Sequence, residues 1–126
     1  MTTDTAGAAG PDFVSFQVRD LAASADFYER LVGLTRLPAP NPQAAVFSRG
    51  GTSFAVRAPL PGVDLDAGPL GLGVGVWFHD PDAGALHARL VEHGVTVTQE
   101  PAEGPFGTTF AFRDPDGYEV TIHSRG

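Results

Sequence analysis

Apolar positions in the first part of the chain change from strand-like to helical spacing. Residues 13–18, FVSFQV, are rich in β-prone side chains and lead into Asp20, a predicted helix N-cap. The next apolar side chains recur at helical intervals: Phe27, Tyr28, Leu31 and Val32. Gly33 is predicted to end this helix. After the proline-rich stretch RLPAPNPQ, the segments AAVFS and TSFAVR are predicted to be two short strands around a turn at Gly50 and Gly51.

The same order of elements recurs in the second half. Residues 73–78, GVGVWF, are predicted to be a strand, with Asp80 as the N-cap of the next helix and Pro81 as its first residue. The apolar side chains of this helix are again at helical spacing: Leu86, Leu90 and Val91. The helix is expected to stop at His93 and Gly94.

Superposing these two halves predicts an internal duplication. Asp20 laid on Asp80 places Phe13 on Gly73, and the glycine before TSFAVR laid on Gly117 places that strand on YEVTIH. A strand–helix–strands unit of about 50 residues therefore occurs twice. We expect residues 1–11 to be a flexible tail and residues 12–126 to be one domain, with module one at 12–58, a linker at 59–71 and module two at 72–124.

Two segments carry a resemblance to a known family. RDLAASADFYERLVGL and FRDPDGYEVTIH together resemble the vicinal oxygen chelate superfamily, which includes glyoxalase I, extradiol dioxygenases, fosfomycin resistance enzymes and bleomycin resistance proteins. The resemblance covers residues 12–124. It implies an α+β fold in which tandem βαβββ modules form a cupped, barrel-like mixed sheet with the helices outside, usually in a dimer. It also implies that a small molecule is held in the cup.

Strand alternation sorts side chains between the helices and the cup. The set predicted to pack on the helices is apolar: Val14, Phe16, Val18, Phe54, Val56, Val74, Val76, Phe78, Tyr118, Val120 and Ile122. Ser53, Gly73, Gly75 and His79 are assigned to the cup face. The candidate ligand-binding residues lie on that face or on the GPFG loop at 104–107: Phe13, Ser15, Gln17, Ala55, Arg57, Trp77, Phe106, Glu119, Thr121 and His123.

Several of these residues have two interpretations. Trp77 either forms an aromatic wall for a flat or cationic ligand or fills space in an unused cup, and Phe13 is either a wall or a core plug. Arg57 either binds an anionic or carbonyl group together with His123 or pairs with Glu119. Phe106 is a lid or a turn anchor.

The resemblance implies a metal held by four strand residues, and this chain lacks suitable donors there. Two of these positions each stand seven residues before an aspartate that is predicted to cap a helix: Phe13 before Asp20, and Gly73 before Asp80. A third stands four residues after the glycine of DPDG, at Thr121, and its repeat partner is Ala55. Because these side chains are poor ligands, we expect no metal and no cofactor. The alternative is one divalent ion held by other residues such as Glu119 or His123.

The remaining histidines suggest no second motif. His87 and His93 are six residues apart, so they do not share a helix face and are expected to be surface residues. His79 is either a surface residue at a strand end or a contact at the rim of the cup.

Composition narrows the classes of partner. The net charge of −7 comes from 15 acidic and 8 basic residues without a basic stripe, which argues against nucleic acid and is compatible with a cationic small molecule or simply with solubility. Cysteine is absent, so disulfides and thiolate sites are excluded. The sequence shows neither a signal peptide nor an apolar membrane span, and a cytoplasmic location is expected.

The expected function is small-molecule binding. By resemblance to bleomycin resistance proteins, we expect a metal-free homodimer that sequesters or senses an aromatic or cationic ligand, as in antibiotic resistance. The alternative is a metal-dependent lyase, isomerase or dioxygenase similar to glyoxalase I. A third possibility is a purely structural or interaction role, in which the cup is filled by its own side chains.

Overall fold

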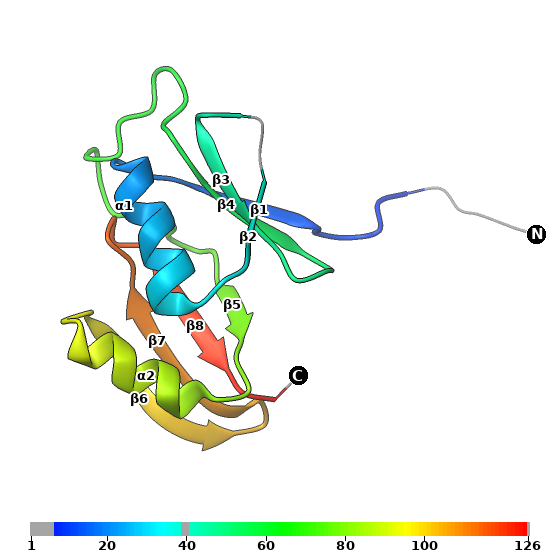
Figure 1. Ribbon diagram of the computed structural model, residues 1–126, viewed down its shortest axis with the longest axis vertical. Coiled ribbons are helices and arrows are strands. Elements are labelled where there is room, and N and C mark those ends of the chain that lie inside the picture. The colour runs from blue at the N-terminus through cyan, green and yellow to red at the C-terminus, as the bar shows by residue number, and fades with distance from the viewer. Residues whose placement is uncertain (1–6, 39–40, 126) are drawn as a thin grey trace, which may run out of the picture.

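The computed structural model describes residues 7–38 and 41–125 and contains two βαβββ modules (Figure 1). The first comprises β1 (Phe13–Gln17), α1 (Leu21–Asp26), the π-helix η1 (Phe27–Val32) that continues α1, β2 (Arg36–Leu37), β3 (Ala44–Phe47) and β4 (Ser53–Arg57). The second comprises β5 (Val76–His79), α2 (Ala83–Glu92), β6 (Val97–Gly104), β7 (Gly107–Arg113) and β8 (Glu119–His123). The predicted α+β architecture of tandem modules is confirmed. None of the described helices is long and apolar enough to cross a membrane.

Each module builds its own four-stranded mixed sheet. The strand orders are β1-β4-β3-β2 and β5-β8-β7-β6. In both sheets the first strand of the module pairs in parallel with the last, as β1 with β4 and β5 with β8, while the other pairs are antiparallel. The two sheets are separate and do not close into one barrel within the chain.

The first helix begins and ends as its sequence predicts. The Asp20 carboxylate accepts a hydrogen bond of 3.0 Å from the Ala23 backbone N–H, which satisfies one free donor of the first turn. Gly33 ends the helix with a φ of 89°, in the left-handed region that favours glycine.

The predicted cap of the second helix was wrong by two residues. The N-cap is Asp82, whose carboxylate accepts from the Ala85 N–H at 3.1 Å. Asp80 instead accepts from the Asp82 N–H at 2.8 Å, so its carboxylate stabilises the turn that precedes the helix. Pro81 therefore lies before the cap and not at the first helical position.

This correction moves the repeat alignment by two residues. Asp82 laid on Asp20 places Gly75, rather than Gly73, on Phe13. The strand pairing agrees, because Gln17 pairs with Arg57 as His79 pairs with His123. An even shift keeps every side chain on its assigned face.

The strand at residues 73–78 also begins later than predicted. β5 starts at Val76, and the segment before it is irregular. Val74 was expected in the core but is 70% exposed, because it precedes the paired part of the strand.

One hydrophobic core joins the two modules through their helix-facing sides. It contains the apolar faces of both sheets together with buried side chains of the helices. Phe54 of β4 contacts Phe78 of β5 with ring centroids 5.1 Å apart, and Phe16 of β1 stacks on Tyr118 at 4.1 Å. Because the apolar faces pack into this shared core, the polar faces of the two sheets point away from it. A single chain therefore does not enclose the cup.

The β6–β7 hairpin presents Phe106 at its tip. β6 ends at Gly104 and β7 begins at Gly107, so Pro105 and Phe106 form the connection. Gly107 has a φ of 81°, and a Cβ there would collide with Ser124 Oγ and lie 3.0 Å from the Arg125 backbone nitrogen. Only glycine fits this position, which fixes where the hairpin turns.

Candidate ligand-binding site

The polar face of the β5–β8 sheet carries an exposed aromatic cluster. The Trp77 and Phe106 rings meet edge to face, with centroids 5.4 Å apart and an interplanar angle of 69°. The His123 ring lies 5.9 Å from Trp77 on the neighbouring strand. Trp77 remains 50% exposed and Phe106 54% exposed. A flat molecule can stack on these rings without displacing any core side chain.

Thr121 and Glu119 complete this face. Thr121 is the strand partner of Trp77 and is half-buried beside it. Glu119 is exposed, and its Oε2 accepts a 2.6 Å hydrogen bond from the Thr98 hydroxyl. The structure records no contact between Glu119 and Arg57, which lie on different sheets.

The candidate ligand-binding residues of the first module differ in how accessible their side chains are. Phe13 is 53% exposed at the start of β1, and Ser15 is exposed on the same face. Ala55 is only 2% exposed, so its side chain offers a ligand almost no surface. Gln17 Oε1 accepts from the Leu60 N–H at 2.7 Å, which ties the side chain to the linker.

Arg57 and His123 are not brought together within one chain. The Arg57 Nε donates to the Ala58 carbonyl at 3.0 Å on the first sheet. His123 is on the second sheet. Arg57 and His123 could contact the same ligand only if the polar faces of the two sheets were brought opposite each other.

The metal positions implied by the resemblance do not suit a metal ion. After the correction to the repeat they are Phe13, Ala55, Gly75 and Thr121, which supply at most one hydroxyl. Over residues 7–38 and 41–125, no group of three or more histidine, cysteine, aspartate or glutamate side chains is placed to hold an ion. This donor set could not hold the catalytic ion of a typical family enzyme.

A groove of ≈ 810 Å³ borders β5. It runs between β5 and the β3–β4 hairpin, and its lining is largely apolar, with Val14, Leu34 and Phe78 at its walls. Arg49 and His79 add polar groups, and Trp77 borders the groove as well as the aromatic cluster. Trp77 therefore belongs to the lining of the groove as well as to the exposed aromatic cluster.

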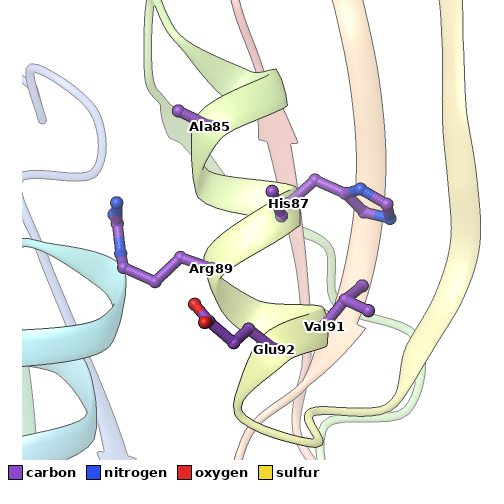
Figure 2. Close-up of a pocket in the computed structure, with 6 residues that line it drawn as sticks. Ala85, His87, Arg89, Val91 and Glu92 are labelled. Carbon is purple, nitrogen blue, oxygen red and sulfur yellow. The ribbon is translucent and has the colours of Figure 1, made fainter.

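The outer surface of α2 does not form a convergent site. Figure 2 shows the side chains around a shallow depression pointing in different directions, with Arg89 turned toward the first module and His87 toward the strands. Arg89 Nε donates to the Leu31 carbonyl at 2.8 Å, which joins α2 to η1. His87 was expected at the surface but is half-buried, with its ring 5.2 Å from Phe110. Its Nε2 lies 3.4 Å from a Glu100 oxygen without forming a hydrogen bond.

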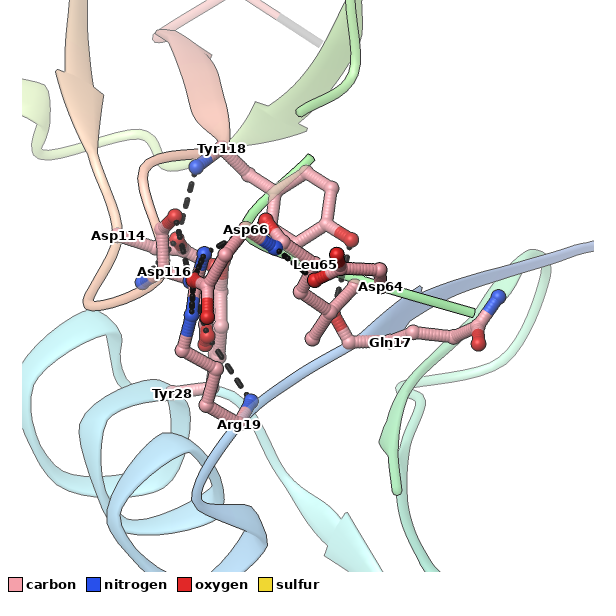
Figure 3. Close-up of polar contacts among 9 residues, drawn as sticks. All are labelled: Gln17, Arg19, Tyr28, Asp64, Leu65, Asp66, Asp114, Asp116 and Tyr118. Atoms are coloured by element: carbon pink, nitrogen blue, oxygen red, sulfur yellow. Dashed lines mark hydrogen bonds and ion pairs between the residues drawn. The ribbon is translucent and has the colours of Figure 1, made fainter. Parts of the chain in front are cut away.

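Arg19, which follows β1, forms a clamp that joins the first module to both the linker and the DPDG turn of the second module (Figure 3). Arg19 Nε donates to Asp66 Oδ1 at 2.9 Å, and its Nη2 donates to the Leu65 carbonyl at 2.7 Å. The Nη1 group reaches Asp116 Oδ1 at 3.0 Å in the DPDG turn. The hydrogen bond to Asp66 is the main reason that the pKa of Arg19 is raised above its ordinary value. The clamp is partly exposed, so its main effect is to position segments far apart in sequence.

A buried tyrosine–aspartate pair lies next to this clamp. The Tyr28 hydroxyl on η1 donates to Asp114 Oδ2 at 2.7 Å. Asp114 Oδ1 accepts from the N–H groups of Asp116 and Tyr118, both at 2.9 Å. Burial raises the pKa of Asp114 above its usual value, and these three hydrogen bonds oppose the rise. Burial, and then the charge of Asp114, raises the pKa of Tyr28 well above its usual value.

Sequence reasoning did not identify this clamp and buried pair. Tyr28 was read only as an apolar helix residue, and Asp114 and Asp116 only as members of a turn. The available signal was a tyrosine on an otherwise apolar helix face, because a buried hydroxyl needs a partner.

Comparisons with known proteins agree with this geometry. Residues 10–122 match the family model described as the Glyoxalase/Bleomycin resistance protein/Dioxygenase superfamily. The structure is similar to that of TnmS3, an antibiotic binding protein from Streptomyces sp. CB03234, with 27% identity, a TM-score of 0.74, and coverage of 97% of this chain and 100% of that chain. It is also similar to a glyoxalase/bleomycin resistance protein from the same Streptomyces, with 28% identity, a TM-score of 0.70, and coverage of 90% and 99%.

A third neighbour shares the fold alone. The fosfomycin resistance protein FosX from Mesorhizobium loti is 20% identical with a TM-score of 0.69, and the match covers 95% of this chain and 94% of that chain. A search of curated protein sequences found no match.

Proposed function

Because this chain belongs to the glyoxalase/bleomycin resistance protein/dioxygenase superfamily, we propose that it is a binding protein for a small aromatic molecule, held against Trp77. The observation that carries this proposal is the half-exposed pair of Trp77 and Phe106 on a sheet face outside the core. Large aromatic side chains are seldom left exposed together unless something covers them. The similarity to an antibiotic binding protein supports a ligand of that kind.

The cup is completed by a second copy of the chain. Within the described residues, β1 pairs only with β4 and β5 only with β8, so each sheet has a free edge next to its exposed aromatic side chains. Phe13 lies on the polar face of the first sheet, and Trp77 and Phe106 lie on the polar face of the second sheet. Covering the exposed half of these three side chains would bury roughly 300 Å² and contribute about 7 kcal/mol before the cost of association. A homodimer that apposes the two faces therefore forms two cups.

Polar groups around the aromatic wall favour a cationic or hydrogen-bonding ligand. Glu119 and Thr121 share the face of Trp77, and Ser15 would approach from the other copy. The net charge of −7 adds a long-range attraction for cations. A positively charged aromatic ligand would gain both stacking and cation–π stabilisation on the indole.

Binding in this cup does not depend on the family's metal ion. This part of the proposal is supported by the four positions implied by the resemblance, where the side chains offer at most one hydroxyl. The alternative of a metal-dependent lyase, isomerase or dioxygenase needs an ion held by several protein donors, and residues 7–38 and 41–125 place no group of three or more histidine, cysteine, aspartate or glutamate side chains to hold one. We therefore assign sequestration or sensing as the role and no chemical step.

A ligand screen with a matched control tests the proposal. Polycyclic aromatic antibiotics, cationic and neutral, are titrated into the protein while the fluorescence of Trp77, the only tryptophan, is recorded, and positives are measured by calorimetry. The Trp77→Ala variant should lose binding by calorimetry. Leu60→Ala, which removes an exposed apolar side chain from the linker, should bind as wild type does. Undiminished binding by Trp77→Ala, or no binding across the panel, would contradict the proposal.

A further inference from the structure

Two histidines form a pair at one end of the β5–β8 sheet. His79 is the last residue of β5 and His123 the last residue of β8, and the two are direct partners across the parallel strands. Their rings lie on the same face, with centroids 5.3 Å apart and an interplanar angle of 43°. His79 is exposed and His123 half-buried, so solvent ions can reach the pair. No role in the proposed stacking site requires both imidazoles.

Each ring is fixed by a backbone carbonyl. His79 Nε2 lies 3.2 Å from the Ser124 carbonyl oxygen, and His123 Nδ1 lies 2.8 Å from that of Arg125. Carbonyl oxygens only accept hydrogen bonds, so these two nitrogens carry the protons. In the neutral rings, His79 Nδ1 and His123 Nε2 therefore keep their lone pairs. Histidines that bind metals are oriented in this way, with the other nitrogen donating to a carbonyl or carboxylate.

The separation of the rings suits a shared metal ion. Metal–nitrogen distances of about 2 Å and a tetrahedral angle place the centroids of two coordinated imidazoles about 5 Å apart. The observed 5.3 Å agrees with this separation. The neighbouring Asp80 adds a negative charge at this end of the sheet.

We infer that His79 and His123 chelate one divalent transition metal ion of the Zn²⁺ and Cu²⁺ class, with water in the remaining positions. Imidazole nitrogens favour these ions over Mg²⁺ and Ca²⁺. The site differs from the metal position of the family, because His123 lies two residues beyond Thr121 and His79 four beyond Gly75. It needs neither the second copy nor an organic ligand, so it is independent of the proposed function.

Trp77 provides a local readout of this site. Its ring lies 5.9 Å from His123, so Cu²⁺ bound to the pair would quench its fluorescence. The chain has four histidines, and the other two, His87 and His93, lie on and just after α2. His79→Gln and His123→Gln test the pair, while His87→Gln and His93→Gln are matched controls.

Titration of the wild-type protein with Cu²⁺ should give saturable quenching at one ion per chain, reversed by a chelator. The two pair variants should lose the saturable component, and the two controls should keep it. Zn²⁺ should shift the imidazole NMR signals of His79 and His123 but not those of the controls. Circular dichroism establishes that each variant is folded. Equal quenching in all variants, which means adventitious binding only, or no saturable quenching in the wild type, would overturn the inference.

Discussion

The hydrogen bond between Tyr28 and Asp114 makes the sharpest stability prediction. Tyr28→Phe removes one hydroxyl and leaves the ring in the core, where Tyr28 is 0% and Asp114 6% exposed. A hydrogen bond to a charged group contributes about 1.5–3 kcal/mol, and the change leaves a buried carboxylate oxygen without its donor. We therefore expect a loss of about 2–3 kcal/mol in unfolding free energy, or roughly 10 °C in Tm for a domain of this size.

Tyr118→Phe is the matched control. The Tyr118 hydroxyl donates to the Gln17 carbonyl at 2.8 Å, so the same atom is removed from a neutral, half-buried hydrogen bond. The expected cost is about 1 kcal/mol. Urea unfolding of both variants measures the difference. Equal losses would refute the argument that the buried carboxylate makes Tyr28 special.

The cost of Tyr28→Phe should also depend on pH. The Tyr28 hydrogen bond lowers the pKa of Asp114, so its removal raises that pKa further in the folded state. A raised folded pKa gives stability that is present at low pH and lost as the pH rises through it. The penalty should therefore be smaller at pH 4–5 than at pH 7.5. For the same reason, the wild type should lose stability relative to Asp114→Asn as the pH rises over this range. A penalty that is constant across this range would show that Asp114 does not titrate as described.

Three further predictions concern the caps, the hairpin and assembly. Asp82→Ala should cost about 1 kcal/mol in thermal or urea unfolding, because it removes the observed N-cap of α2; no loss would contradict the revised helix start. Gly107→Ala should cost more than about 1 kcal/mol, since a Cβ collides with Ser124 at a positive φ, whereas Gly84→Ala, with open space at φ < 0, should not destabilise. Sedimentation equilibrium should give two chains of 13.1 kDa per particle, and a monomer at all concentrations would argue against the shared cup.

Local patterns predicted the elements that have strong local signals. Alternation in FVSFQV and YEVTIH identified the buried faces, and Asp20 and Gly33 fixed the limits of the first helix. The DPDG turn was predicted from its residues, and in the structure Gly117 has a φ of 98°, a positive value that favours glycine. β6 was not predicted, although VTVT alternates at its start, because Pro101 and two glutamates interrupt the strand pattern.

Other features depend on contacts that are distant in sequence. Asp80 and Asp82 are both plausible caps, and only the path of the chain into α2 selects between them. An apolar strand face predicts that the face will be buried. It does not predict whether the face will pack against the other module of the same chain or against another chain. That choice is stabilised by long-range contacts such as those of Arg19 with Asp66 and Asp116. Sequence alternation therefore predicted which residues lie on the polar face of each sheet. It did not show that the two polar faces point away from each other within one chain.

Subunit complementation tests the shared ligand cup most directly. Phe13→Ala damages one wall and Trp77→Ala the other, so each variant alone should fail to bind a ligand found in the screen. In dimers formed from an equimolar mixture, one cup of each mixed dimer receives both intact walls, so about a quarter of the cups should recover binding by calorimetry. If both walls belonged to the same chain, every cup would keep a defect. A mixture that binds no better than either variant alone would contradict the account.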